Sequence, residues 1–177
     1  MNFRSLFFPV IYSFLSIISI SITFYGGFTK YLNIVTIIAW LFIIPFCVAS
    51  MIDAKKIKFN NQIGGKELSR EGLKFLMVST LILVVFQIIF FNAGFKAYKI
   101  NFIQTYGVEL AKLQIKNGHL TIKDSEIPKL INEEIKQVTL FKECTSIVFK
   151  NLFLGVITVI ISSVILRKKT NLPPNNA

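Results

Sequence analysis

The chain has few of the residues from which metal centres and disulfide frameworks are built. Its 177 residues include 2 cysteines and 1 histidine. Cys47 and Cys144 belong to no CxxC pair and to no Cys/His cluster, so the sequence predicts no zinc or iron–sulfur ligation. His119 follows an Asn-Gly pair in the most polar region, and we interpret it as a solvated turn residue rather than a catalyst. No metal and no cofactor are therefore expected.

Acidic residues are also scarce, with 9 Asp and Glu against 20 Lys and Arg, and the formal net charge is +11. A basic excess occurs in nucleic-acid-binding proteins, but it is equally typical of the cytoplasmic loops of membrane proteins. The hydrophobic fraction is 53%, and the apolar residues stand in blocks, whereas a soluble domain distributes them by period. The blocks favour a membrane protein with no nucleic-acid partner.

Four apolar runs have no charge in their interiors, and a helix of about 20 such residues crosses a bilayer. Lys150 lies near one end of the fourth run, where its side chain can reach the membrane surface. Arg4 before the first run would suit a signal peptide, but the run is too long for one and no A-x-A-like cleavage site follows. We expect the run to be retained. The predicted spans are residues 6–28, 34–52, 75–91 and 146–166.

The distribution of positive charge predicts the orientation of the spans. Lys and Arg gather in the 53–74 loop and in the C-terminal tail, whereas the connection between the first two spans holds only Lys30. We therefore expect both termini and the 53–74 loop in the cytoplasm and the 92–145 segment outside. On this topology Cys47 and Cys144 lie towards opposite faces, and no disulfide joins them.

The 92–145 segment predicts a hairpin of two amphipathic helices, because its apolar residues recur every three or four positions. The second helix can continue into the fourth span, since only Gly155 after Lys129 would interrupt it. The first stripe is Phe102, Ile103, Tyr106, Leu110 and Leu113, and the second is Ile127, Leu130, Ile131, Ile135, Val138 and Phe141. The positions that we expect to form the hairpin core or to contact a partner are Leu110, Leu113, Leu130, Ile131 and Ile135.

Residues 113–122, which connect the two helices, leave two interpretations open. An Asn-Gly pair between alternating apolar residues is a β-hairpin signal. Gly118 can equally be the left-handed residue that ends the first helix. Because an isolated two-stranded hairpin is marginally stable in water, we favour the helix stop.

The Gly64-Gly65 pair is the feature most similar to a phosphate-binding loop, but it does not match one. A P-loop reads G-x-x-x-x-G-K-[ST], whereas Gly65 is followed by Lys-Glu and the position five before it is Asn60. We interpret the pair as a connection that permits positive φ, with the third helix starting around Leu68–Gly72.

Ion and proton pathways in membranes usually need charged residues, which the span interiors lack. We interpret the hydroxyls of the Ser-rich first span as helix-packing groups, expect Gln87 to bond to another helix, and expect Pro45 to kink the second span. No G-x-S-x-G or H-E-x-x-H motif exists, so an enzyme is not expected.

One short loop pattern is shared with a known family. Its residues here are Gly64, Gly65, Gly72, Leu73 and Lys74, and Leu68–Arg70 stand where that pattern has Ser-Phe-Gly. Together with the order of the spans, the loop resembles a family of small integral membrane proteins that is common in Bacteroidota and is catalogued as a domain of unknown function. The resemblance implies a bacterial inner membrane and no activity, substrate or cofactor.

The sequence thus predicts an all-α fold, a single membrane domain over residues 1–177. Four spans form a bundle, and an extracytoplasmic helical hairpin lies between the third and the fourth. The leading hypothesis is a non-enzymatic scaffold or accessory subunit that presents this hairpin to a partner protein or associates with itself. One alternative is an oligomeric transport or permeability component in which the Ser-rich first span faces a shared cavity. A second is a membrane-interface enzyme, for which no cofactor or lipid product is indicated.

Overall fold

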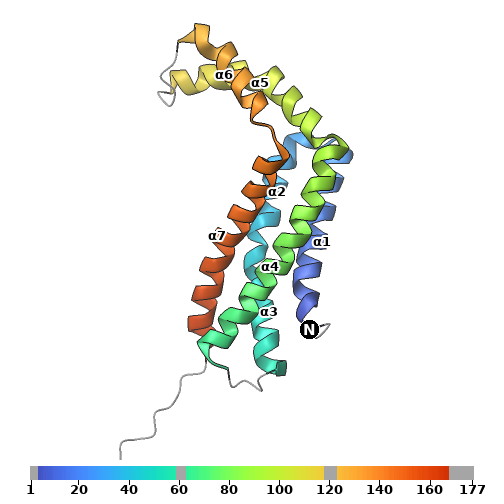
Figure 1. Ribbon diagram of the computed structural model, residues 1–177, viewed down its shortest axis with the longest axis vertical. Helices are drawn as coiled ribbons and strands as arrows, with labels where there is room; N and C mark the ends of the chain where they lie inside the picture. Colours follow the sequence, from blue (N-terminus) through green and yellow to red (C-terminus); the bar gives the residue numbers. More distant parts are fainter. Residues whose placement is uncertain (1–3, 59–62, 118–122, 168–177) are drawn as a thin grey trace, which may run out of the picture. The chain divides into compact units, whose positions relative to one another are not determined.

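The computed structural model describes residues 4–58, 63–117 and 123–167, which form helices and short connections (Figure 1). No strand occurs in these ranges, so the expectation of an all-helical fold is confirmed there. The helices are α1 (Arg4–Tyr25), α2 (Leu32–Leu41), α3 (Ile43–Lys58), α4 (Gly65–Phe90), α5 (Lys96–Lys116), α6 (Ile127–Lys136) and α7 (Leu140–Leu166). Short 3₁₀ turns lie at Thr29–Tyr31 and Asp124–Glu126, and the chain is kinked within Phe91–Phe95, where Gly94 has a φ of 125°.

The chain divides into two compact units. Unit 1 comprises Met1–Leu83 and Ile147–Ala177, and unit 2 comprises Val84–Ser146. Unit 1 contains α1, α2, α3 and most of α4 and α7, whereas unit 2 contains α5, α6 and the remaining ends of α4 and α7. The expectation of a single membrane domain stays a prediction.

Among the described residues, four helical segments are long and apolar enough to cross a membrane, as the sequence predicts. A helix satisfies every backbone amide within one segment, which is the requirement that hydrocarbon imposes. The chain is therefore a multi-pass membrane protein. The segments are Leu6–Tyr25, Thr29–Ile57, Gly65–Lys116 and Leu140–Leu166.

The first span ends at Tyr25 rather than at residue 28, because a glycine stops the helix there. Gly27 has a φ of 81°, a conformation that favours glycine. The N–H of Phe28 donates to the Thr23 carbonyl over 3.0 Å, and the N–H of Gly27 donates to the Phe24 carbonyl over 3.4 Å. These two bonds form a Schellman motif, which satisfies the last carbonyls of α1.

The second span consists of two helices, α2 and α3, separated at Phe42. Pro45 has no N–H to donate to the carbonyl four residues earlier, and its ring crowds that carbonyl. The interruption falls in the turn before Pro45, which agrees with the expected disturbance.

The 53–74 connection is shorter than predicted, because α3 continues to Lys58 and α4 begins at Gly65. The prediction of positive φ at Gly64 and Gly65 was wrong; the glycines with positive φ in the described part of the chain are Gly27 and Gly94. Gly65 instead opens α4 with ordinary helical geometry.

Unit 1 packs through small residues where its helices cross. The hydrophobic effect does not drive helices together in lipid, because the lipid tails are as apolar as the side chains. Close packing therefore contributes more to helix association there than it does in water. A Cβ added at Gly72 of α4 would lie 2.6 Å from Val159 Cγ2 of α7 and 3.0 Å from Met51 Sδ of α3. Gly155 of α7 packs in the same way against Leu76 of α4. The glycines therefore permit the approach of three helices.

The expected continuous helix from the second outer helix into the fourth span was wrong, because α6 ends at Lys136 and α7 begins at Leu140. The hydroxyl oxygen of Thr139 accepts a hydrogen bond from the Lys142 N–H over 3.3 Å. Threonine in this position is a favourable N-cap, because it satisfies an amide that lacks an intrahelical partner. A new helix therefore starts at this point.

The structure tests the two interpretations of the connection between α5 and α6 only in part. Residues 113–116 are helical, so the β-hairpin interpretation was wrong for its first arm. Gly118, which we expected to stop the helix, and His119 both lie outside the described residues.

Candidate functional site

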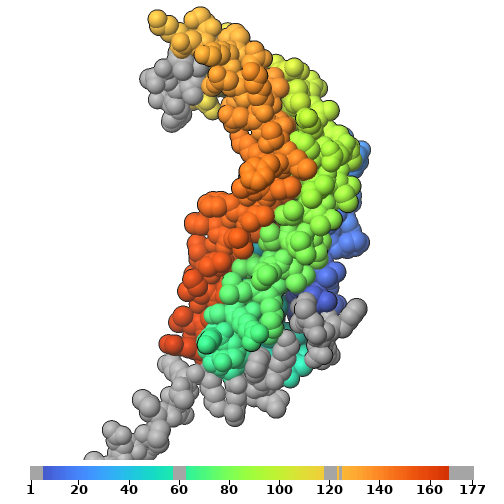
Figure 2. All heavy atoms as spheres, in the orientation of Figure 1, coloured from blue at the N-terminus to red at the C-terminus, as the bar shows by residue number. Residues whose placement is uncertain are grey.

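The α5–α6 hairpin of unit 2 is held together by small and aliphatic side chains. Ile103, Gly107 and Ala111 repeat every four residues and so share one side of α5. Ala111 is buried with Ile127 and Ile131 of α6, and Ile103 packs against the same cluster. A Cβ added at Gly107 would lie 3.3 Å from Ile131 Cγ1. The two helices lie directly against each other (Figure 2).

The predicted core and contact positions divide between two surroundings. Leu130, Ile131 and Ile135 belong to the α5–α6 cluster. Leu110 and Leu113 lie outside it, with 46% and 54% of their surfaces exposed. The role of these positions in contacting a partner stays a prediction.

The predicted apolar stripe of α5 coincides only in part with the face that packs against α6. The predicted stripe combined Ile103, which faces α6, with larger residues on the neighbouring side of the helix. The face that packs includes Gly107 and Ala111, which carry little hydrophobic signal. Their positions, four and eight residues after Ile103, could have indicated this face, because small residues mark close helix crossings.

A second apolar face of α5, here called the α5 stripe, remains exposed. Its rings Phe102 and Tyr106 are 39% and 50% exposed, and their centroids lie 5.2 Å apart. Large apolar patches on exposed surfaces commonly mark interaction sites. The residues of the α5 stripe are Phe102, Tyr106, Leu110 and Leu113.

The α5 stripe continues a series of aromatic rings that starts near the end of α4. Neighbouring rings stack or tilt against each other through the kink at Phe91–Phe95 and along α5. Each ring is therefore positioned by the one before it. Centroid separations are 5.2 Å for Phe86–Phe90, 4.9 Å for Phe90–Phe95, 6.2 Å for Phe95–Tyr98 and 6.3 Å for Tyr98–Phe102.

An ion pair adds to the order of this unit. The ammonium group of Lys99 on α5 donates to a carboxylate oxygen of Glu143 in the first turn of α7. The same ammonium lies 5.4 Å from the centroid of the Phe95 ring, which is a cation–π contact. Exposed fractions of 37% and 16% mean that water screens the pair only in part.

The loop positions of the family pattern lie at the start of α4 and take different roles. Gly64 accepts the first hydrogen bond of the helix, from the N–H of Leu68 over 3.2 Å. Leu73 is 43% exposed. The Lys74 ammonium pairs with Glu71, which is 8% exposed, at 2.7 Å. Gly72 lies where helices cross, as described above. The contacts of these pattern residues therefore serve folding and packing.

The same end of unit 1 holds further contacts between helices. Lys55 of α3 donates to the carbonyl of Leu166 over 2.7 Å, where a cation favours the C-terminal end of α7. The hydroxyls of Ser69 and Ser163 are hydrogen bonded at 2.8 Å and join α4 to α7. Polar side chains here tie helix ends together.

Groups typical of metal sites do not converge in the described ranges: no cluster of three or more His, Cys, Asp or Glu residues could hold a metal ion there. Cys47 is buried, Cys144 is half-buried, and both thiols are free.

The hydroxyls of α1 bear on the transport alternative. Ser13 and Ser16 are buried and donate to the carbonyls of Pro9 and Tyr12 over 2.8 Å and 2.9 Å. Thr23 is also buried. Ser19 of the same helix is exposed, so the hydroxyl groups of α1 lie partly inside unit 1 and partly on its surface, and the transport alternative stays a prediction.

One polar residue of the fourth span was missed. Asn151 is buried, and its amide donates to the hydroxyl of Thr80 over 3.4 Å, which joins α7 to α4. The amide side chain within an apolar run could have predicted this bond, because such side chains form hydrogen bonds between helices in membranes. The cross-helix bond expected of Gln87 stays a prediction, although its side chain is buried.

Comparison with known proteins gives one match. The model of the family described as "Protein of unknown function (DUF4199)" matches residues 5–168. No curated protein and no solved structure matches the chain.

Proposed function

The chain belongs to the DUF4199 family of proteins of unknown function, and because this membership brings no activity with it, we propose a role from the geometry of unit 2. The protein is a non-enzymatic membrane scaffold or accessory subunit that docks a partner protein on the α5 stripe. Its assignment as a non-enzyme is part of the proposal.

The observation that carries the proposal is that α5 is apolar on two neighbouring sides and uses only one of them against α6. The side with Gly107 and Ala111 is buried, whereas Tyr106 and Leu110 are 50% and 46% exposed. Folding of the hairpin does not need the second side. Aromatic and aliphatic residues held in place by their neighbours suit the central contacts of an interface.

The proposed location is a bacterial inner membrane with both termini in the cytoplasm. The uneven distribution of Lys and Arg supports this orientation, because cytoplasmic loops carry the positive excess. In this arrangement α5 and α6 belong to the extracytoplasmic segment. The partner is then a periplasmic protein or the extracytoplasmic part of another membrane protein.

Site-specific photo-crosslinking in living cells tests the docking surface. A photoreactive residue at Leu113 should give a discrete protein adduct of defined mass. The matched control is Thr105, which is exposed on another side of α5, and should give none. Adducts with lipid alone at Leu113, or the same adducts from both positions, would contradict the proposal.

Two substitutions separate docking from folding. Leu110→Asp should leave the thermal unfolding of the purified protein unchanged and abolish the adduct formed at Leu113, because position 110 is exposed. Ile131→Asp should unfold the hairpin, because it places a charge in the buried cluster. Loss of folded protein with Leu110→Asp would indicate that the α5 stripe is part of the core.

A further inference from the structure

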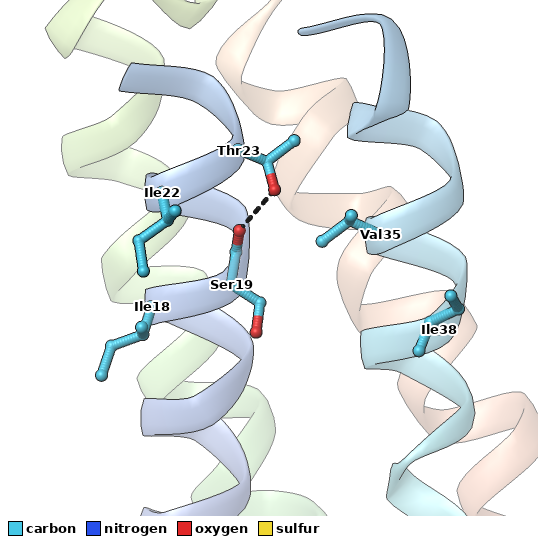
Figure 3. Close-up of a pocket in the computed structure, with 6 residues that line it drawn as sticks. All are labelled: Ile18, Ser19, Ile22, Thr23, Val35 and Ile38. Carbon is cyan, nitrogen blue, oxygen red and sulfur yellow. Dashed lines mark hydrogen bonds between the residues drawn. The ribbon is translucent and has the colours of Figure 1, made fainter. Parts of the chain in front are cut away.

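A groove between α1 and α2 has no role in the proposal above. Its volume is about 400 Å³ (Figure 3), which is within the range of roughly 300–1,000 Å³ that is usual for small-molecule sites. Ser19 and Thr23 on α1 face Val35 and Ile38 on α2. The lining residues are Ile18, Ser19, Ile22, Thr23, Val35 and Ile38.

The walls of the groove suit hydrocarbon rather than a polar solute. The hydroxyl of Thr23 donates to the Ser19 carbonyl over 2.7 Å, and the hydroxyl of Ser19 donates to the Leu15 carbonyl over 2.8 Å. Both hydroxyl protons are thus used within α1, and the other lining side chains are aliphatic. A ligand in the groove gains contact with methyl and methylene groups.

The position of the groove indicates where its occupant comes from. Both walls belong to segments long and apolar enough to span the membrane. The apolar stretches of Leu6–Tyr25 and Thr29–Ile57 are 28% and 22% buried, against 39% and 33% for the other two. The first two spans therefore leave the largest share of their apolar stretch unburied. In a bilayer this share contacts lipid acyl chains, which can enter the groove.

The turn that joins the two walls offers a site for a charged headgroup. Phe28 and Tyr31 of this turn are 57% and 47% exposed, and such aromatic rings favour the membrane–water interface. Lys30 between them is exposed, and its ammonium lies 4.8 Å from the centroid of the Tyr31 ring. A positive charge at this depth attracts a lipid phosphate.

We infer that the α1–α2 groove binds one acyl chain of an anionic glycerophospholipid whose phosphate pairs with Lys30. Charge favours this occupant over a second copy of the chain. The protein has a net charge of +11, and a symmetric copy docked on the same groove would bring a second Lys30 to the first. The inference is independent of the proposed docking on α5.

Native mass spectrometry of the intact protein tests the site. The protein is released from vesicles of equal parts phosphatidylglycerol and phosphatidylcholine with identical acyl chains. We expect one retained lipid with a preference for phosphatidylglycerol. Lys30→Gln should lower that preference about fivefold, the effect of one lysine at an anionic surface. An unchanged preference would overturn the assignment of the phosphate to Lys30.

The groove itself is tested by Val35→Trp, which fills it and should remove the retained lipid whatever its headgroup. The control is Ile165→Trp on α7, at a position 72% exposed, which should keep the lipid. Retention by the Val35 variant, or a wild-type dimer that this variant abolishes, would overturn the inference. If Val35→Trp does not fold, Lys30→Gln in the exposed turn still decides the outcome.

Discussion

At the scale of single residues, unit 1 is organised by a few small or polar side chains at helix crossings. Gly72 lies against α3 and α7, and Asn151 and Ser69 each form a hydrogen bond between α4 and α7. The sequence favours a turn at Gly64 and Gly65 and places Gly72 only in the pattern shared with a known family. Only the packed helices show that Gly72 is needed for space.

Gly72→Ala should destabilise the protein, because the new methyl group would lie 2.6 Å from Val159 Cγ2. Overpacking of this kind costs roughly 1–3 kcal/mol. The free energy of unfolding in mixed detergent micelles measures the change. Gly65→Ala is the matched control, since its Cβ would lie 3.8 Å from the nearest atom, the Ser163 carbonyl oxygen. Equal stability of the two variants would contradict the close approach at Gly72.

At the scale of elements, the sequence predicted which segments are helical more accurately than it predicted the residues at which the helices begin and end. Apolar period and charge-free length predicted the amphipathic helices and the four spans. The ends depended on local bonds that the apolar pattern does not record. Gly27 ends α1 early, and Thr139 separates α6 from α7.

Thr139→Ala should lower the free energy of unfolding by about 0.5–2 kcal/mol, because the Lys142 N–H loses its acceptor at the start of α7. The measurement is reversible unfolding followed by circular dichroism. Thr139→Ser keeps the hydroxyl and should retain most of the stability. Thr145→Ala, at an exposed position within α7, should be neutral or slightly stabilising because alanine favours helix. A loss of the same size at Thr145 would rule out a specific cap at Thr139.

The hairpin shows why a candidate site is harder to predict than a span. Leu110 and Ile131 have the same hydrophobic character, yet one is 46% exposed and the other 9%. On α5, the packed face combines Ile103 with the small residues Gly107 and Ala111, whereas large apolar residues also occupy the exposed face, so hydrophobicity alone does not identify the packed face. The choice depends on how closely α6 approaches Gly107.

At the scale of the whole molecule, the described residues contain four helical segments long and apolar enough to cross a membrane, and their orientation is proposed. Thr105→Cys and Lys66→Cys, each in a Cys144→Ser background, can be labelled in spheroplasts with a maleimide that does not cross membranes. The proposed orientation places Thr105 outside and Lys66 inside. We therefore expect immediate labelling at position 105, and labelling at position 66 only after permeabilisation. The reverse result would invert the topology and place the α5 stripe in the cytoplasm.

The sequence by itself determined that the protein is helical and crosses the membrane several times. This follows because each backbone amide in hydrocarbon must be satisfied within its own helix, so length and the lack of charge are sufficient information. Only the packing of the helices shows which side of α5 is buried, why residue 72 is a glycine, and that a groove lies between α1 and α2. These features depend on the distance between helices that are far apart in the chain, which no local pattern records.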